Sequence, residues 1–464
     1  MNQALLDAIL RADFENFLRK CTVSLSPGER FIHNWHIRAL AWHLEQVRLG
    51  KIKRLIINMP PRSLKSIAAS VAFPAFVLGH DPTRRIICVS YGIDLAIKHA
   101  NDFRAIIEAP WFRRLFPLMQ LSGTKNTETE VATTQHGFRL ATSVGGPLTG
   151  RGGDIFVIDD PLKPSDAFSA AKREAANQFF SNTLLSRLND KRTGAIIIVM
   201  QRLHMDDLTG FVTAQSEDWT VLTLPAIAEA DEWVQEADDL YHRFTAGEAL
   251  QPEREPLEEL ERLRRQLGSD LFAAQYQQRP VPESGVIIKR DWVRRYKTLP
   301  PCTARTRIEQ SWDTAAKVGP ENAWSVCSTW QVEGDEYYLI DVTRGRFDFP
   351  ALKAKALALA TQYSPHRILI EDVGTGTALI QELRKAGRVT IPVRSEQDKI
   401  TRMAIQSAKF EAGMVYLPEA APWLAVFEEE LFSFPSSKYS DQVDTVSQIL
   451  GHQGGGGISM VDYL

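Results

Sequence analysis

Residues 54–66 read RLIINMPPRSLKS, and this stretch decides how the first half of the chain folds. Its start has the β-branched, apolar pattern of a buried strand, and an apolar helix pattern follows from residue 67. A strand, a tight loop and a helix that begins at Lys-Ser is the arrangement of a phosphate-binding loop. Met59 and Leu64 stand where such loops carry glycine, so a proline-rich surface turn is the alternative.

The loop offers most of the groups that nucleotide phosphates need. Pro60 and Pro61 lack an N–H, but the amides from Arg62 to Ser66 can point at a phosphate. Lys65 supplies an ammonium group for the phosphates of ATP, and the Ser66 hydroxyl can bind Mg²⁺. The candidate nucleotide-binding residues of this loop are Pro61, Arg62, Ser63, Leu64, Lys65 and Ser66.

A second strand pattern, IFVIDD over residues 155–160, ends in two adjacent carboxylates. In ATP-hydrolysing domains one such carboxylate holds Mg²⁺ through water, and the next orients or activates the attacking water. We therefore predict Asp159 for the metal shell and Asp160 as the catalytic carboxylate, although glutamate is commoner at the second position. The alternative is a solvated Asp-Asp-Pro turn.

Other polar residues surround this predicted ATP site. Arg151, in GRGGD before the strand, is either a candidate arginine finger that acts on a neighbouring subunit's nucleotide or an ordinary loop arginine. Gln201 and His204 follow the strand pattern AIIIVM and are candidate γ-phosphate sensors. Trp35 and His36 are candidates for stacking on adenine, although tryptophan at helical spacing is also typical of a core.

Short apolar runs alternate with amphipathic helices, which predicts an α/β fold with a parallel sheet covered on both faces. We expect a first domain over residues 1–280, whose residues 1–50 are helical. The segment PVPESG, residues 280–285, marks the boundary, and a linker over 281–300 leads to a second domain over 301–450. The second domain begins with an antiparallel meander, and the glycine-rich residues 451–464 form a flexible tail.

The composition is that of a soluble, folded protein. Apolar residues make up 44% and charged residues 24% of the 464 residues, which excludes a disordered or fibrous chain. The net charge of −3 gives no general basic field, so any contact with DNA must be local. Four scattered cysteines argue against a zinc ribbon or a disulfide framework and indicate reduced thiols inside a cell. No apolar stretch is long enough to span a bilayer.

The second domain places acids at the ends of separated strand patterns. Asp313 lies in SWDTA, and Glu371 and Asp372 end a buried strand pattern. Asp441 and Asp444 lie in YSDQVDTVSQ near the C-terminus. Cleavage of a phosphodiester with two metal ions needs three or four carboxylates that converge on Mg²⁺ or Mn²⁺. This order of acids is that of an RNase H-like domain, although each acid alone is also compatible with a solvated surface carboxylate.

Together these motifs resemble the large terminase subunit of tailed bacteriophages and prophages. The resemblance covers nearly the whole chain and rests on PPRSLKS, IFVIDDP, VMQRLH, FAAQYQQRPVP, SWDTA, LIEDVGTG, KITRMAIQSAKFEAGMVYLP and SDQVDTVSQ. It implies an α/β chain in which a P-loop ATPase domain of the ASCE/RecA-like class is followed by an RNase H-like nuclease domain. The implied cofactors are ATP and Mg²⁺, with Mg²⁺ or Mn²⁺ at the nuclease site.

The resemblance also implies roles for individual residues of the second domain. Asp313, Glu371 and Asp441 would hold the nuclease metals and support DNA cleavage, with Asp444 close by. Ser440 stands where many relatives have an aspartate, so the third ligand is either Asp441 or Asp444.

One helical face of the second domain is basic. Lys399 and Arg402 lie on it and are candidates for contacts with the DNA backbone, and a solvated basic face is the alternative.

The implied function is a viral DNA-packaging motor, in which ATP hydrolysis drives double-stranded DNA into the procapsid and an endonuclease cuts the concatemeric genome. The implied partners are DNA, the small terminase subunit and the portal protein of the procapsid, where the chain forms a homo-oligomeric ring, a pentamer; a monomer in solution is also expected. The protein would act in the host cytoplasm, without a membrane and outside the mature virion. The alternatives are a helicase or remodelling ATPase without nuclease activity, and an inactive prophage scaffold.

Overall fold

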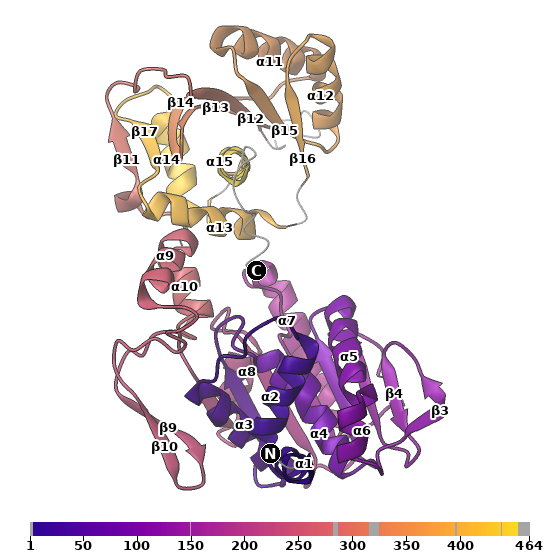
Figure 1. Ribbon diagram of the computed structural model, residues 1–464. Coiled ribbons are helices and arrows are strands. Elements are labelled where there is room, and N and C mark those ends of the chain that lie inside the picture. The colour runs from indigo at the N-terminus through magenta and orange to yellow at the C-terminus, as the bar shows by residue number, and fades with distance from the viewer. Residues whose placement is uncertain are drawn as a thin grey trace. The chain divides into compact units, whose positions relative to one another are not determined.

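The computed structural model describes residues 3–148, 150–281, 286–314, 324–394, 397–437 and 439–452 (Figure 1). The chain divides into two compact units: Met1–Leu263 with Asp270–Val281, and Arg264–Ser269 with Pro282–Leu464. Of the predicted linker and tail, residues 282–285 and 453–464 lie outside the described residues. Within the described ranges, no helix combines the length and apolarity that crossing a membrane requires.

A single large sheet forms the centre of the first unit. Its strands are β1 (Arg54–Asn58), β2 (Arg85–Ser90), β3 (Leu121–Asn126), β4 (Glu130–Thr133), β5 (Phe138–Ser143), β6 (Ile155–Asp159), β7 (Ala195–Met200) and β8 (Thr220–Thr223). They lie in the order β3-β4-β5-β2-β6-β7-β1-β8. All neighbours from β5 to β8 are parallel, and β3 and β4 extend the sheet antiparallel. The carboxyl ends of β1, β6 and β7 therefore lie at one edge of the sheet.

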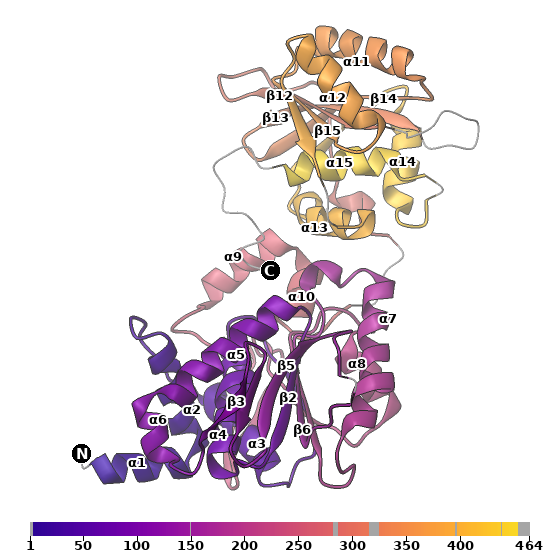
Figure 2. The ribbon, with the colours of Figure 1, turned by 90° about the vertical axis from the view of Figure 1, so that its right-hand side faces the viewer.

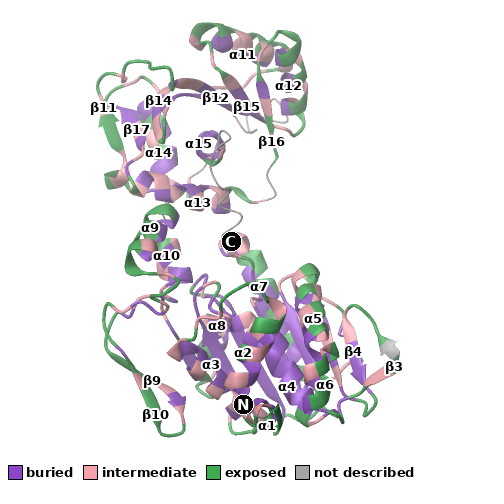
Figure 3. Cartoon of the chain, viewed as in Figure 1, coloured by how far each residue is buried: buried purple, intermediate pink, exposed green. Residues whose placement is uncertain are grey.

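Helices cover both faces of this sheet (Figure 2). They are α1 (Gln3–Ala12), α2 (Phe14–Leu25), α3 (Trp35–Arg48), α4 (Phe73–His80), α5 (Ile93–Glu108) and α6 (Pro110–Leu115) on one face, and α7 (Ala170–Gln178) and α8 (Leu208–Gln215) on the other. In β7, Ile197 and Val199 join the core on the first face, and Ile196 and Ile198 join the core on the second. The strands are buried on both sides for this reason (Figure 3), which confirms the predicted doubly covered parallel sheet.

The remaining elements of this half of the chain lie outside the sheet. They are the hairpin β9 (Glu232–Ala237) and β10 (Leu240–Phe244), the helices α9 (Leu257–Leu267) and α10 (Ser269–Gln275), and the π-helical turns Ile67–Ala72 and Phe179–Leu184. The sequence patterns do not predict the hairpin, whose strands leave the large side chains of Trp233, Leu240 and Tyr241 exposed.

The second unit is built around a seven-stranded sheet. Its strands are β11 (Arg294–Tyr296), β12 (Arg307–Asp313), β13 (Ser325–Glu333), β14 (Glu336–Gly345), β15 (Arg367–Glu371), β16 (Thr390–Val393) and β17 (Val415–Pro418). They lie in the order β11-β17-β14-β13-β12-β15-β16. β12, β13 and β14 form the predicted antiparallel meander, and β15 pairs parallel with β12.

Helices cover both faces of the second sheet as well. They are α11 (Phe349–Tyr363) and α12 (Thr375–Lys385) on one face, and α13 (Lys399–Glu411), α14 (Leu424–Ser433) and α15 (Asp441–Gly451) on the other. Trp312 and Ile370 belong to the core under α11 and α12. Because side chains alternate along a strand, the next residues, Asp313 and Glu371, point to the face covered by α13 and α15.

Candidate functional site

The loop after β1 turns through two residues with a left-handed backbone, neither of which is glycine. Arg62 and Leu64 are both in the left-handed region, with φ of 57° and 64°. For residues other than glycine this conformation costs roughly 1–2 kcal/mol each, so other contacts must hold it. The buried Ser63 hydroxyl supplies one, because it donates to the Pro60 carbonyl at 2.8 Å. Leu64 thus makes the turn that glycine normally makes.

The loop meets the end of β6 through short polar contacts. Lys65 is buried, donates to the Pro60 carbonyl at 3.4 Å, and its Nζ lies 3.9 Å from Asp160 Oδ2. The Ser66 hydroxyl donates to Asp159 Oδ1 at 2.9 Å. The structure therefore brings together the lysine, hydroxyl and two carboxylates that the sequence predicts for an ATP site.

Burial raises the pKa of both the Asp159 and the Asp160 carboxyl, and the Lys65 ammonium opposes the rise. Asp160 has a φ of 44°, and its Oδ1 accepts the backbone N–H of Gln201 at 3.2 Å. A carboxylate whose pKa is raised is a stronger base than usual, which suits a group that accepts a proton. The side-chain Oε1 of Gln201 is buried and has no hydrogen-bond partner in the described chain.

Three residues behind Asp159 are not predicted from the sequence. The Ser70 hydroxyl donates to Asp159 Oδ2 at 2.7 Å, and His99 Nδ1 lies 3.4 Å from the same oxygen. Burial lowers the pKa of His99 to about 4, so this ring is neutral at physiological pH. Arg139 is fully buried in β5 and donates to the Ser70 carbonyl at 3.1 Å. An arginine inside a strand pattern is the one sequence signal that points to this cluster.

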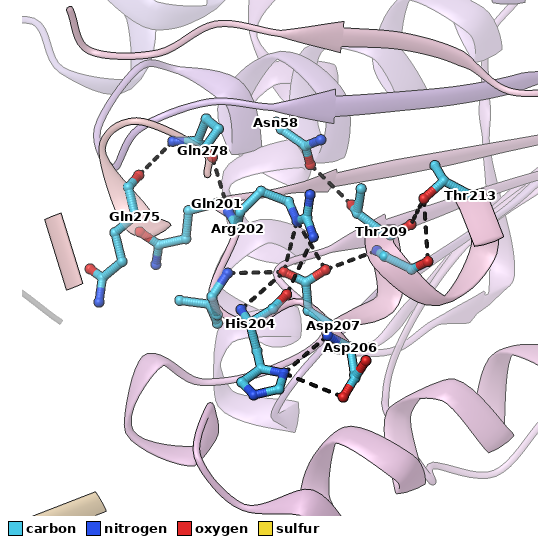
Figure 4. Close-up of polar contacts among 12 residues, drawn as sticks. Asn58, Gln201, Arg202, His204, Asp206, Asp207, Thr209, Thr213, Gln275 and Gln278 are labelled. Atoms are coloured by element: carbon cyan, nitrogen blue, oxygen red, sulfur yellow. Dashed lines mark hydrogen bonds and ion pairs between the residues drawn. The ribbon is translucent and has the colours of Figure 1, made fainter. Parts of the chain in front are cut away.

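A polar network follows β7 and positions the loop around Gln201 (Figure 4). Arg202 pairs with the buried Asp207 carboxylate at 2.9 Å, and Asp207 also accepts the backbone N–H groups of Leu203 and Gly210. The backbone N–H of Arg202 donates to Gln278 Oε1 at 2.9 Å. The segment after α10 is therefore bonded directly to the residue that follows Gln201.

Arg151 and His204 make contacts other than the predicted ones. Arg151 forms a bidentate pair with Glu130 at 2.8 and 2.7 Å, which raises the pKa of its guanidinium, and it lies over the Phe138 ring. His204 Nδ1 accepts the backbone N–H of Asp206 at 3.0 Å. A role of Arg151 on a neighbouring subunit stays a prediction, and it requires release from Glu130.

The aromatic pair near the N-terminus packs inside its own unit. Trp35 stacks on His242 at 4.2 Å and packs against Phe244. Burial lowers the pKa of His36 to about 3, so it is neutral. These contacts favour the core interpretation of Trp35 over stacking on adenine.

The second unit gathers four acids at one edge of its sheet. Asp313 and Glu371 end the neighbouring parallel strands β12 and β15, in which Trp312 lies opposite Ile370. The other two, Asp441 and Asp444, are buried in the first turn of α15, which packs on β12 and β13. Burial raises the pKa of Asp313 well above its ordinary value, and the three neighbouring acids, Asp444 foremost, add to the rise.

The two predicted DNA contacts lie among these acids. Lys399 forms an ion pair with Asp444, and its Nζ lies 4.0 Å from Asp313 Oδ2. Arg402 Nη2 donates to Asp444 Oδ1 at 2.8 Å. Both cations are thus directed to Asp444, and their contact with DNA stays a prediction. Asp441 holds only a backbone amide in the described chain, that of Trp324 at 3.0 Å from its Oδ2.

The four acids are the right type of ligand for divalent metal ions, but their side chains are too far apart in this structure to bind one together. Buried carboxylates are the oxygen donors that Mg²⁺ and Mn²⁺ prefer. In the described residues, however, no three acidic, histidine or cysteine side chains converge closely enough to hold an ion. Asp372 is turned away, because it pairs with Arg394 at 2.8 Å, which lowers the pKa of its carboxyl. Asp444 is occupied by two cations, so Asp313, Glu371 and Asp441 are the better candidates for ligands.

Residues 310–452, which carry all four acids, match the family model described as the terminase RNase H-like domain. Together with the observed sheet order, this match gives the second unit an RNase H-like fold. No curated protein matches the sequence of the chain.

Solved structures of other proteins share the fold of most of this chain. The large terminase from a thermophilic bacteriophage has a TM-score of 0.55 at 9% identity, covering 91% of this chain and 99% of that chain. The same terminase in complex with ADP has a TM-score of 0.51 at 9% identity, covering 89% and 99%. In complex with ATP-γ-S it has a TM-score of 0.51 at 10% identity, covering 88% and 98%. The resemblance to large terminases is thus confirmed, by the family model over residues 310–452 and by the fold over most of the chain.

The network around Asp207 predicts a stability effect. Replacing Asp207 with alanine leaves the largely buried Arg202 guanidinium unpaired, so we expect the first unit to lose about 3 kcal/mol. Asp206→Ala is the control, because the Asp206 carboxylate is mostly exposed, and it should change stability by less than about 0.5 kcal/mol. Urea unfolding measures both, and equal midpoints for the two variants would contradict the assignment.

The raised pKa of Asp313 predicts a pH-dependent effect in the RNase H-like domain. The pKa of Asp313 is higher in the folded than in the unfolded state. The folded state therefore loses stability as the pH rises from the unfolded-state pKa to the folded-state pKa. In EDTA at pH 8, Asp313→Asn should therefore melt at a higher temperature than the wild type, and the gap should close as pH falls toward about 4. Asp372→Asn, whose carboxyl has a lowered pKa, should show no such gain. A lower melting temperature of Asp313→Asn at pH 8 would refute this.

Proposed function

We propose that this chain is the large subunit of a phage terminase. Its first unit hydrolyses ATP to drive double-stranded DNA into a procapsid, and its second unit cuts the concatemeric genome with divalent metal ions. The observation that carries the proposal is the RNase H-like domain with Asp313 and Glu371 at neighbouring strand ends, on a chain with the fold of a large terminase.

The geometry after β1 and β6 supports ATP hydrolysis. The amides of the loop and the Lys65 ammonium would bind the phosphates, and Ser66 and Asp159 would hold Mg²⁺. The ion would neutralise charge on the phosphates when bound. Asp160 would orient the attacking water and accept its proton, because burial makes this carboxyl more basic than usual. Gln201, whose backbone N–H donates to Asp160, would report the state of the site to the loop that follows it.

The acidic cluster supports phosphodiester hydrolysis. Asp313, Glu371 and Asp441 would hold the metal ions, which would stabilise the attacking and leaving oxygens when bound. Lys399 already compensates the charge of Asp313 and Asp444 in this arrangement. Divalent ions therefore have to replace or complement this ammonium.

A packaging role also implies partners and a place of action. We propose the small terminase subunit, the portal protein and DNA as partners, with a homo-oligomeric ring on the portal and action in the host cytoplasm. These proposals are supported by the resemblance to large terminases. A helicase-type ATPase would share the first site but would not need the second, so metal-dependent cutting of plasmid DNA separates the two functions. Absence of ATP hydrolysis would favour an inactive scaffold.

Lys65→Ala should lower ATP turnover by about a hundredfold or more, because no other ammonium group is held beside Asp160 in the described chain. Lys51→Ala, which removes an exposed lysine of the same unit, is the control and should leave turnover unchanged. A phosphate-release assay measures both. Near-normal ATP turnover by Lys65→Ala would show that this loop does not bind the phosphates of ATP.

The two sites should fail independently, because each is assembled from residues of one unit. Asp313→Ala should abolish cutting with Mn²⁺ and leave ATP hydrolysis intact, and Lys65→Ala should do the opposite. A fragment that begins near Val286 should cut DNA without ATP. Asp372→Ala is the matched control for cutting, since its carboxylate is held by Arg394 outside the cluster. Loss of ATP hydrolysis in a folded Asp313→Ala protein would show that the acids serve the motor.

A further inference from the structure

Two arginines stack on one tryptophan beside the acidic cluster. The Cζ atoms of Arg344, at the end of β14, and of Arg346, just after it, each lie 4.3 Å from the centre of the Trp324 ring. The Tyr439 ring lies edge-on to Trp324 and 5.1 Å from Arg344 Cζ. We call these three residues, Trp324, Arg344 and Arg346, the arginine platform.

The side-chain N–H groups of the platform lack hydrogen-bond acceptors among the described residues. A guanidinium carries several N–H donors and no acceptor, and buried donors normally find partners. In the described part of the chain neither guanidinium makes a hydrogen bond, and Nε of both arginines and Nε1 of Trp324 are buried without an acceptor. Among the described residues, Glu430 forms an ion pair with Arg344 at 3.9 Å, and Arg346 forms none. Two adjacent cations with free donors favour an anionic ligand that supplies several oxygen acceptors.

The register of the sheet places the platform next to the acids. Val326 of β13 pairs with Asp313 on one side and with Arg344 on the other, so these three side chains point to the same face. Two strand spacings separate Asp313 from Arg344, about 10 Å, which is the rise of about three nucleotides along a DNA strand. The backbone N–H of Trp324 is bonded to Asp441, which ties the platform to the cluster itself.

We propose that the arginine platform binds the phosphodiester backbone of the DNA strand that is cut, a few nucleotides from the acids. This inference rests on the proposed nuclease function and names the residues that hold the substrate. Stacking on Trp324 fixes the plane of each guanidinium, which leaves a pre-oriented fork of N–H groups that matches phosphate oxygens. Because the contacts reach backbone oxygens and no base edges, binding is independent of sequence.

The test compares the full chain with Arg344→Gln/Arg346→Gln in EDTA, where DNA binds without being cut. Fluorescence anisotropy with a short DNA duplex at several salt concentrations should show affinity about tenfold weaker at low salt. The slope of log K against log salt should fall by about 2, one for each lost phosphate contact. Cutting with Mn²⁺ should require more DNA, while the Mn²⁺ concentration for half-maximal rate stays unchanged.

Arg294→Gln is the matched control. Arg294 also stacks on an aromatic ring, that of Tyr416, in the same unit. Tyr416 pairs with Tyr338, so Arg294 lies about 20 Å along β14 from Arg344. Its loss should leave DNA affinity and salt slope as in the wild type.

The outcomes separate this inference from the function on which it rests. If the wild type neither binds nor cuts DNA, the proposed function fails. If the wild type does both and the double variant binds with unchanged affinity and slope, the platform is structural and the inference is overturned. If the double variant does not fold, the single variant Arg346→Gln replaces it in the test. Arg346 forms no ion pair in the described chain, so its replacement should not unfold the protein. Its salt slope should fall by about 1, and an unchanged slope overturns the proposal.

Discussion

Asp159 is buried at the end of β6 with each carboxylate oxygen held by a hydroxyl, Ser66 on one side and Ser70 on the other. A buried carboxylate is costly unless it is paired and hydrogen-bonded, and this requirement organises the first unit. It fixes the helix after the loop against the end of β6, places Lys65 beside Asp160, and explains why Arg139 and His99 lie behind the site.

The second unit also has buried carboxylates that need charged or hydrogen-bonding partners, but other elements supply them. Its acids come from two strand ends and one helix, and Asp313 is driven toward its protonated form by burial and by its neighbours. Lys399 and Arg402 of α13 relieve this repulsion by pairing with Asp444. Each unit thus sets a lysine from the first turn of a helix against carboxylates at strand ends. Lys65 faces Asp160, the residue after β6, whereas Lys399 faces Asp313 at the end of β12 and also pairs with Asp444 of α15.

The sequence predicts those parts of the two sites that depend on local order. Strand patterns followed by Lys65-Ser66, by Asp159-Asp160 and by Glu371 place these residues at strand ends, and parallel pairing then brings strand ends to one edge. It does not reveal contacts that depend on which elements become neighbours. Arg139 lies two strands away from β6, with β2 between them, and Gln278 is distant in sequence from Arg202. The spacing of Lys399 and Arg402 shows that they share a helix face. Whether this face contacts solvent, DNA or Asp444 depends on where α15 packs.

Residues whose backbone conformation is unusual for their residue type gather around the first site. Six described residues other than glycine have a left-handed backbone. They are Arg62, His136, Leu64, Asp160, Gln278 and Ser364. Four of these belong to the loop after β1, to the end of β6 or to the segment bonded to Arg202. Such residues are strained and persist only where surrounding contacts hold them, which is typical of sites that must present backbone amides and a carboxylate in one fixed arrangement. Leu64 belongs to this group, because the contacts of Ser63 and Lys65 with the Pro60 carbonyl hold the loop around it.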